Sequence, residues 1–222
     1  MCRLVTPCLL ALLALGCGSD VELVRDPEPE HVDDPSPGVN FEPVAYPPGP
    51  YGTRGTSVVP NFEFRGWPDP PAVAYDPARL DYMSLGEFWD PDGAKDIRYI
   101  LMNASAVWCT FCRQEMRDIK SSGRFASYRE KGVLIIGTLY EDNSGNPAKP
   151  EDLELWGSME GHEIEFPLLL DPSFQTQSFM DYGGTPLNVL IDAKTMRIVH
   201  NQIGFTGSID TFWSTIDALT AQ

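Results

Sequence analysis

The sequence predicts an α/β fold, with a central β-sheet flanked by helices and an extension at the N-terminus, and three observations support it. Residues 97–107 and 132–141 have the composition of buried strands, and the second is apolar on both faces, as central parallel strands are. Residues 109–131 between them fit a helix with a kink at 121–123, which completes a strand–helix–strand crossover. The chain then alternates helices and strands, and its 222 residues, 42% of them hydrophobic, are enough for one sizeable core.

The remaining elements follow from periodicity and turn residues along the chain. Residues 56–66 alternate between two faces around a proline, which predicts an edge strand, and residues 84–89 fit either a short strand or a helical turn. Further along we expect a helix at 151–160, a short helix at 174–180, a hairpin of strands 185–193 and 196–205, and a closing helix at 208–219 with Trp213 on its apolar face.

Residues 1–16 have the layout of a secretory signal peptide. One positive charge, Arg3, precedes an apolar run from Cys8 to Leu15, and small residues follow. The run is too short to span a bilayer as a helix. The sequence therefore predicts an exported protein whose first residues are removed.

The end of this segment, LALGC, resembles the lipobox of bacterial lipoproteins. It matches at Leu15, Gly16 and Cys17, and it departs at Ala14, where leucine is usual. The resemblance implies acylation of Cys17, and hence a membrane-anchored protein in the cell envelope that faces the periplasm or the cell exterior. Gly18 in place of aspartate implies sorting to the outer membrane. The alternative is an ordinary signal peptide, cleaved near Cys17 without a lipid.

An acidic, proline-rich tether is predicted at residues 17–55, ahead of a folded domain at 56–222. The stretch from Gly18 to Pro77 holds 13 of the 20 prolines, and its first part has no sustained periodicity. The alternative is a segment ordered against the domain, which its tyrosines and Phe41 permit.

The net charge of the chain is −16, and loss of Arg3 leaves 15 basic against 32 acidic residues, or −17. Such a surface repels nucleic acid and anionic lipid headgroups, so we expect no nucleic-acid partner.

The five cysteines are divided between the signal segment and one pair, Cys109 and Cys112. Cleavage and acylation at Cys17 would leave only this pair as thiols, in a compartment where disulfides persist. A bridge across two intervening residues closes almost no loop, so it stabilises the fold little. The pair is therefore better explained by chemistry than by architecture.

The position of the pair favours redox chemistry. A Cys-x-x-Cys pair between a strand and a helix is typical of thiol–disulfide exchange. Cys109 would lie at the first turn of the helix, where unpaired amides and the helix dipole stabilise a thiolate. Cys112 lies one turn further, close enough to attack a mixed disulfide.

Several motifs together resemble the thioredoxin fold, in particular the extracytoplasmic TlpA/ResA-like and AhpC/TSA-like redoxins. They are WCTFC at 108–112, Asn103 six residues before the first cysteine, RQEM after the second, and GGTPLNVLID at 183–192. The resemblance covers about residues 56–222 and implies a thioredoxin-like fold with a mixed central sheet. It also implies thiol–disulfide oxidoreductase activity that needs neither a nucleotide nor a metal cofactor.

The same resemblance implies roles for individual residues. Cys109 is the attacking thiol, Cys112 the resolving one, and the two form a disulfide in the oxidised state. Glu115, one turn beyond, aligns with an acidic residue implicated in proton handling, where a carboxylate accepts the proton of the resolving thiol. The alternative for Glu115 is a solvated glutamate on the helix surface.

Substrate contacts are implied for three further residues. In the family Pro186 is cis and packs beside the disulfide, and Thr185 offers backbone groups to an incoming polypeptide. Trp108 either shapes the substrate groove or covers the core. The dipeptide Thr110–Phe111 lacks both the proline of reductases and the histidine of strong oxidants, so the physiological direction stays open.

Other functions require residues that this chain arranges differently. A zinc site needs about four ligands, whereas one cysteine pair survives maturation and His162 and His200 have no metal-ligand spacing. Copper-delivering thioredoxin folds have three residues between their cysteines and a distal histidine, whereas this chain has two residues there and no histidine in TPLNVLID. Thiol peroxidase activity stays an alternative, although the Pro-x-x-x-Thr-x-x-Cys arrangement is missing. A non-enzymatic surface lipoprotein that binds a partner is the other alternative.

The predicted function is therefore thiol–disulfide exchange outside the cytoplasm. Its expected substrates are exported proteins with thiols or disulfides, and its electrons are exchanged with a thiol-redox partner protein. No metal site is predicted.

Overall fold

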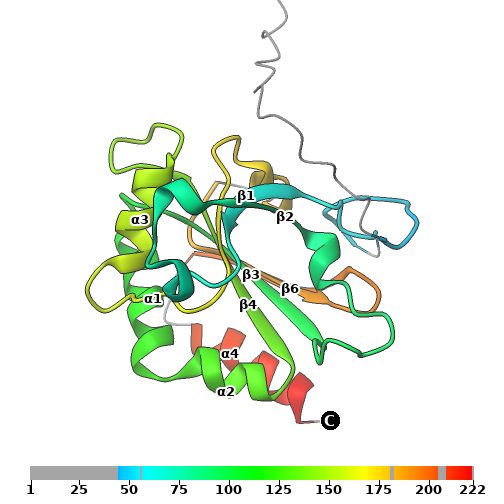
Figure 1. The fold of residues 1–222 in the computed structure, drawn as a ribbon. Helices are drawn as coiled ribbons and strands as arrows, with labels where there is room; N and C mark the ends of the chain where they lie inside the picture. Colours follow the sequence, from blue (N-terminus) through cyan, green and yellow to red (C-terminus); the bar gives the residue numbers. More distant parts are fainter. Residues whose placement is uncertain (1–44, 56, 181–182, 205–208, 222) are drawn as a thin grey trace, which may run out of the picture. The chain divides into compact units, whose positions relative to one another are not determined.

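A mixed seven-stranded sheet is formed by the described part of the chain, which in this computed structural model comprises residues 45–55, 57–180, 183–204 and 209–221 (Figure 1). In spatial order the strands are β2 (Asp81–Ser84), β1 (Glu63–Trp67), β5 (Leu168–Leu170), β4 (Val133–Glu141), β3 (Tyr99–Ala106), β6 (Leu187–Asp192) and β7 (Arg197–Ile203). Strands β3, β4 and β5 are parallel, and the other pairings are antiparallel. The predicted fold class, α/β with a mixed sheet, is confirmed.

Four α-helices are described: α1 (Thr110–Ser121), α2 (Arg124–Glu130), α3 (Pro150–Ser158) and α4 (Ile209–Thr220). Four short 3₁₀ helices join the strands: η1 (Pro71–Val73), η2 (Pro77–Arg79), η3 (Leu85–Phe88) and η4 (Gln175–Phe179). No helix in the described ranges has the length and apolar character that crossing a membrane requires.

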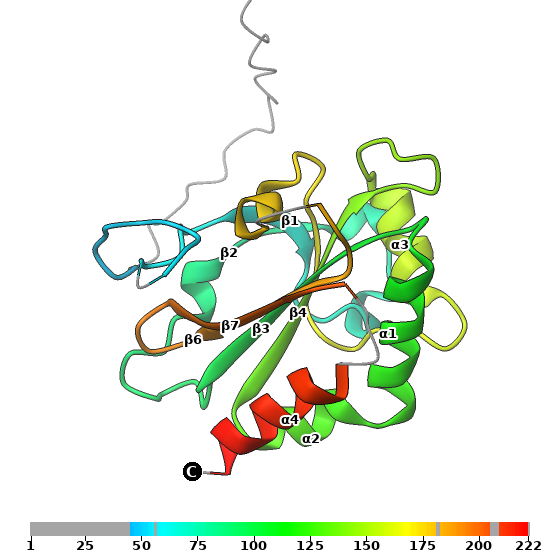
Figure 2. The same ribbon diagram turned by 180° about the vertical axis from the view of Figure 1, so that it is seen from behind.

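Two apolar clusters pack on the sheet. The first takes side chains from all four α-helices. α4 lies beside α2 in both views (Figures 1 and 2), and the Trp213 ring packs against Tyr128. The second is filled by strands, by the 3₁₀ helices η3 and η4 through Leu85 and Phe179, and by the segment before β1 through Val58. Burial of this apolar area is the main stabilising contribution, and it fixes the ends of the strands relative to α1.

The predicted strands around the crossover are confirmed as β3 and β4, but the helix between them differs from a kinked one. It is two helices, because Gly123 adopts a left-handed conformation with φ of 64°. Glycine adopts this conformation without the steric penalty of a side chain, so it ends α1 and restarts the chain as α2. The strand–helix–strand connection itself is as predicted, with β3 and β4 parallel.

The predicted edge strand at 56–66 is wrong in its place within the sheet. The strand begins only at Glu63, and β1 lies inside the sheet, between β2 and β5. β2 was not predicted, because its four residues carry too short a pattern. Of the two options for residues 84–89, a helical turn is found, held by a capping box in which Ser84 N donates to the Glu87 carboxylate at 2.8 Å.

Residues 45–55 contact the domain at several points. The Tyr46 hydroxyl donates to the Val59 carbonyl at 2.8 Å, and the Arg54 guanidinium donates to the carbonyls of Phe179 and Met180 at 3.0 and 2.6 Å. These hydrogen bonds hold the described start of the chain against the second apolar cluster. The predicted signal peptide, Cys17 and the tether up to residue 44 lie outside the described residues.

Candidate active site

A disulfide joins Cys109 and Cys112 where β3 ends and α1 begins, with a Cα–Cα distance of 5.3 Å. After Ala106, the Cys109 amide donates to the Ala106 carbonyl at 3.1 Å, which turns the chain out of the sheet. Cys109 is the residue that caps the N-terminus of α1. The strand end and the helix start therefore fix the position of the sulfur atoms.

The Cys109 sulfur accepts a hydrogen bond from an amide in the first turn of α1, which has no partner within the helix. The Cys112 amide donates to Cys109 Sγ at 3.0 Å, in the manner of a side-chain N-cap. In the reduced protein the same amide and the positive end of the α1 dipole would stabilise a thiolate at Cys109. This geometry suits Cys109 as the nucleophile of the pair.

The disulfide lies directly beneath the surface. Cys109 is 3% exposed and Cys112 is fully buried, whereas Trp108 and Phe111 are 43% and 55% exposed. The two exposed aromatic residues stand on either side of Cys109 in the sequence.

Thr185 lies in the loop before β6, 73 residues after Cys112, and contacts that cysteine. The Thr185 hydroxyl lies 3.3 Å from Cys112 Sγ and donates to the Ala104 carbonyl at 3.1 Å. The peptide bond between Thr185 and Pro186 is cis, as the resemblance implied. Of the two residues predicted in this loop, Thr185 therefore lies beside Cys112, and Pro186 has the expected cis peptide bond.

Glu115 is fully buried, which rules out the solvated alternative. Its two carboxylate oxygens accept hydrogen bonds from Asn188 Nδ2 at 2.6 Å and from Asn103 Nδ2 at 2.7 Å. Asn103 Nδ2 also donates to Asn188 Oδ1 at 3.0 Å, and the Ser105 hydroxyl donates to Asn103 Oδ1 at 2.7 Å. Three strand residues thus hold one helix carboxylate in the core, a turn below Cys112.

Burial raises the pKa of Glu115 to about 7, because a charged carboxylate loses its hydration in the core. The hydrogen bonds from Asn188 and Asn103 oppose this and lower its pKa, while the charge of Asp118 raises it further. A carboxylate with this pKa can both accept and release a proton near neutral pH.

Trp108 does not cover the core; it is fixed at the surface by hydrogen bonding. Its indole Nε1 donates to the Glu141 carboxylate at 2.7 Å, at the end of β4. Beside it, the Arg113 guanidinium donates to the Val107 carbonyl at 2.9 and 2.7 Å and to Asn143 Oδ1 at 3.4 Å. The loop after β4 therefore supports the active-site turn from one side.

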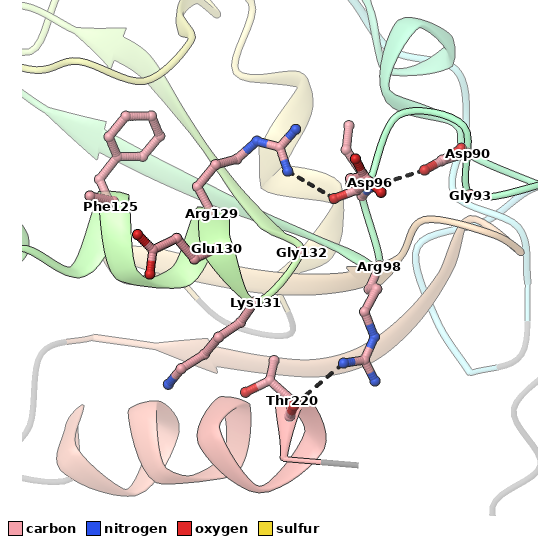
Figure 3. A pocket seen from close by; sticks show the side chains of 12 residues that line it. Asp90, Gly93, Asp96, Arg98, Phe125, Arg129, Glu130, Lys131, Gly132 and Thr220 are labelled. Atoms are coloured by element: carbon pink, nitrogen blue, oxygen red, sulfur yellow. Dashed lines mark hydrogen bonds between the residues drawn. The ribbon is translucent and has the colours of Figure 1, made fainter.

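A cavity of about 1090 Å³ lies at the other end of the parallel strands, near the starts of β3 and β4 (Figure 3). Its two arginines donate to backbone carbonyls, Arg129 to that of Asp96 at 2.8 Å and Arg98 to that of Thr220 at 3.4 Å, and Lys131 pairs with the Asp217 carboxylate at 2.8 Å. Cys109 follows the opposite end of β3, so this cavity is not part of the cysteine site. No group of metal-ligating side chains is found within the described ranges.

Two residues of the site were missed from the sequence, Asn188 and Glu141. Asn188 carries a visible signal, because it is the one polar residue in the apolar run PLNVLI. Its pairing with Asn103 arises from the register of β3 and β6 and is not visible in the sequence. Glu141 has no local signal, since its partner Trp108 lies 33 residues earlier.

No protein-family model matches the sequence, and no curated protein matches it significantly. Solved structures do resemble the fold. A Chlorobium tepidum protein proposed to be the thiol:disulfide interchange protein DsbE has a TM-score of 0.55 at 18% identity, covering 76% of this chain and 99% of its own. A secreted thiol-disulfide isomerase from Corynebacterium glutamicum has a TM-score of 0.53 at 15% identity, covering 75% and 87%.

A reduced 2-Cys peroxiredoxin from Plasmodium vivax is also similar, with a TM-score of 0.51 at 15% identity over 74% of this chain and 80% of its own. At identities this low, the structural similarity establishes a shared fold and no shared activity. The chain therefore has a thioredoxin-like fold, in which the Cys109–Cys112 disulfide stands at the start of the helix that follows β3.

Proposed function

We propose that the protein is a thiol–disulfide oxidoreductase that acts outside the cytoplasm on exported proteins. The observation that carries the proposal is the disulfide at the N-terminus of α1, with a fully buried carboxylate, Glu115, one turn below it. A structural disulfide needs neither a capping amide aimed at its sulfur nor an ionisable group in the core behind it. Both features are useful in exchange chemistry.

In the direction of reduction, the Cys109 thiolate attacks a disulfide of the substrate. A bond forms between Cys109 Sγ and one substrate sulfur, and the other substrate sulfur leaves as a thiolate. The amide of Cys112 supports the negative charge of the Cys109 sulfur before attack. The exposed rings of Trp108 and Phe111 offer apolar contacts to the substrate polypeptide.

Cys112 then resolves the mixed disulfide. Its thiol proton passes to the Glu115 carboxylate, and the resulting thiolate attacks Cys109 Sγ, which releases the second substrate thiolate. The protein is left with the Cys109–Cys112 disulfide, as found in the structure, and the substrate has gained two electrons. The reverse sequence oxidises a substrate dithiol, and the reduction potential of the pair determines which direction prevails.

The location is part of the same proposal. The signal-like residues 1–16 and the lipobox-like Cys17 support an acylated protein held at the envelope by the following acidic segment. A thiol-redox protein in the same compartment would restore the active form of the pair. Labelling with a radioactive fatty acid tests the anchor, and Cys17→Ser is expected to abolish incorporation.

The activity is tested by reduction of insulin disulfides by the dithiothreitol-reduced protein. We expect the parent domain to be active and Cys109→Ser to be inactive. The matched variant Cys112→Ser keeps the attacking thiol and loses the resolving one. It should therefore accumulate a mixed disulfide with insulin, which excess dithiothreitol reduces. Trapping by both variants, or by neither, would contradict the assigned order of attack.

Two other outcomes would point to the alternative functions. A protein inert as both reductant and oxidant would be a partner-binding scaffold with a permanent disulfide. Thiol-dependent consumption of hydrogen peroxide without insulin reduction would indicate a peroxidase.

A further inference from the structure

Asn188 lies where a polar side chain is least expected. It is the second residue of β6 and is fully buried, between Leu187 and Val189, which pack into the second apolar cluster. Its own side chain points to the other face, toward α1, where it meets Glu115. Burial of a carboxamide costs free energy unless its hydrogen bonds are made, so its contacts with Glu115 and Asn103 need a physical explanation.

The three side chains form a closed ring of hydrogen bonds. Asn188 Nδ2 donates to one Glu115 oxygen, Asn103 Nδ2 donates to the other, and Asn103 Nδ2 also donates to Asn188 Oδ1. An ionised carboxylate is an acceptor at both oxygens, and a carboxamide has one acceptor oxygen and one donor nitrogen. With Glu115 ionised, every contact of the ring joins a donor to an acceptor.

Protonation of Glu115 weakens this ring. If the O–H on the oxygen that faces Asn188 is to donate to Asn188, Asn188 must turn its Oδ1 toward Glu115, which places its Nδ2 against Asn103. Asn103 must then turn as well, and its oxygen meets the unprotonated oxygen of Glu115, so one contact is lost. If neither amide turns, the O–H must point away, and the amide donates to a carboxylic hydroxyl, which is a poorer acceptor than a carboxylate oxygen. Protonation of the other oxygen gives the same result, so one contact is lost or weakened in every arrangement.

We propose that Asn188 is a positioning residue that closes a hydrogen-bond ring at its strongest with ionised Glu115, so that the ring favours release of any proton that Glu115 takes up. In the proposed exchange reaction, on which this consequence rests, Glu115 would accept the proton of Cys112 and then discharge it. The three contacts return to full strength when the proton leaves. Burial alone would leave the carboxyl protonated and unable to accept.

The other groups around Glu115 do not supply this effect. Asp118, on the same helix, is the charged group that acts on it, and its charge favours the protonated form. β3 and β6 present uncharged side chains to the carboxylate: Asn103, with Ser105 behind it, and Asn188. The two carboxamides are therefore the donors that oppose protonation in the described part of this core.

The test is the titration of Glu115 in the oxidised protein, followed by the carboxyl ¹³C chemical shift. Asn188→Leu removes the donor and should raise the midpoint by about one pH unit or more. Asn188→Thr keeps one hydroxyl that can donate to Glu115 and accept from Asn103. Its midpoint should therefore lie between those of the parent protein and Asn188→Leu. Thr138→Val is the control, because the Thr138 hydroxyl donates to the Asn103 backbone carbonyl and not to Glu115.

A second measurement needs no variant at position 188. The side-chain amide resonances of Asn188 should move with pH at the same midpoint as the Glu115 carboxyl, and Glu115→Gln should make them independent of pH. Amide signals that stay constant through the Glu115 midpoint would overturn the proposal. An Asn188→Leu midpoint equal to the parental one, or a Thr138→Val shift of the same size, would also overturn it.

The activity assay separates this inference from the proposed function. If the protein reduces insulin, the acid limb of its pH–rate profile should move to higher pH in Asn188→Leu, because Glu115 then ionises at higher pH. If the protein is inert, the proposed function fails, while the titration still decides whether the ring exists.

Discussion

The indole of Trp108 donates a hydrogen bond to the carboxylate of Glu141, with an Nε1–oxygen distance of 2.7 Å. The two residues come from different ends of the crossover, one directly before the disulfide and one at the end of β4. This contact fixes an aromatic ring that is 43% exposed. A large exposed ring held in one orientation is prepared for contact with a partner, because less rotamer freedom is lost on binding.

Replacement of Glu141 by alanine should therefore weaken substrate binding more than it slows the chemical step. Loss of one charge-assisted hydrogen bond predicts roughly a fivefold rise in KM for a disulfide peptide, with kcat little changed. Glu141→Gln keeps an acceptor and should show a smaller rise. Glu154→Ala on α3 makes the same change of charge at an exposed position and serves as the control. A fall in kcat with unchanged KM would contradict a role in binding.

The buried Glu115 should make folding stability depend on pH. Its pKa is about 7 in the folded protein against an ordinary value of 4.5, so the folded state binds this proton more tightly than the unfolded chain. Its contribution is fully present below pH 4.5 and is lost as the pH rises through 7, an effect on the order of 3 kcal/mol.

Urea unfolding at pH 5 and pH 8 tests this dependence. Glu115 should raise the free energy of unfolding of the parent protein at pH 5 relative to pH 8, and Glu115→Gln should lose this contribution to the difference. Glu130→Gln, at an exposed position on α2, should retain it. Equal pH dependence in the parent and in Glu115→Gln would show that this carboxyl is not perturbed.

Removal of the Thr185 hydroxyl should slow the resolving step. In the structure it lies 3.3 Å from Cys112 Sγ, and in the reduced protein its single proton can turn from the Ala104 carbonyl to the Cys112 thiolate. Thr185→Val keeps the shape and loses the donor, which predicts a roughly three- to tenfold longer lifetime of the mixed disulfide. Thr215→Val on α4 is the matched control. Rapid-quench trapping measures the lifetime, and an unchanged value would exclude the contact from the mechanism.

Gly66 should be irreplaceable for the pairing of β1 with β5. It stands opposite Leu169, and a Cβ built on it would lie 2.7 Å from Leu169 Cα. Gly66→Ala should therefore lower the free energy of unfolding by about 2–3 kcal/mol through overpacking. At Gly183 a Cβ would meet no atom within 4 Å, so Gly183→Ala is expected to leave stability unchanged. Thermal unfolding of the two variants provides the comparison.

Much of the fold could be predicted because its strands are apolar and its helices are periodic. The predictions for β3, β4 and β6 needed only runs of apolar side chains, which the structure buries, and β7 followed as the second strand of the predicted hairpin. Cys109 and Cys112 were visible from their spacing. β2 was missed, and β1 was placed at an edge because of Pro60, although the strand begins only after this residue, at Glu63. A strand of four residues has too few side chains to show a period.

The sequence alone determined the kind of chemistry, because the spacing of the two cysteines and the start of a helix are local features of the chain. Tertiary structure decided what surrounds the sulfur atoms. Strand register places Asn188 against Asn103 and Glu115, and the end of β4 brings Glu141 to Trp108. Such contacts join residues 33 to 85 positions apart, and they depend on how the strands pair, which no local pattern encodes.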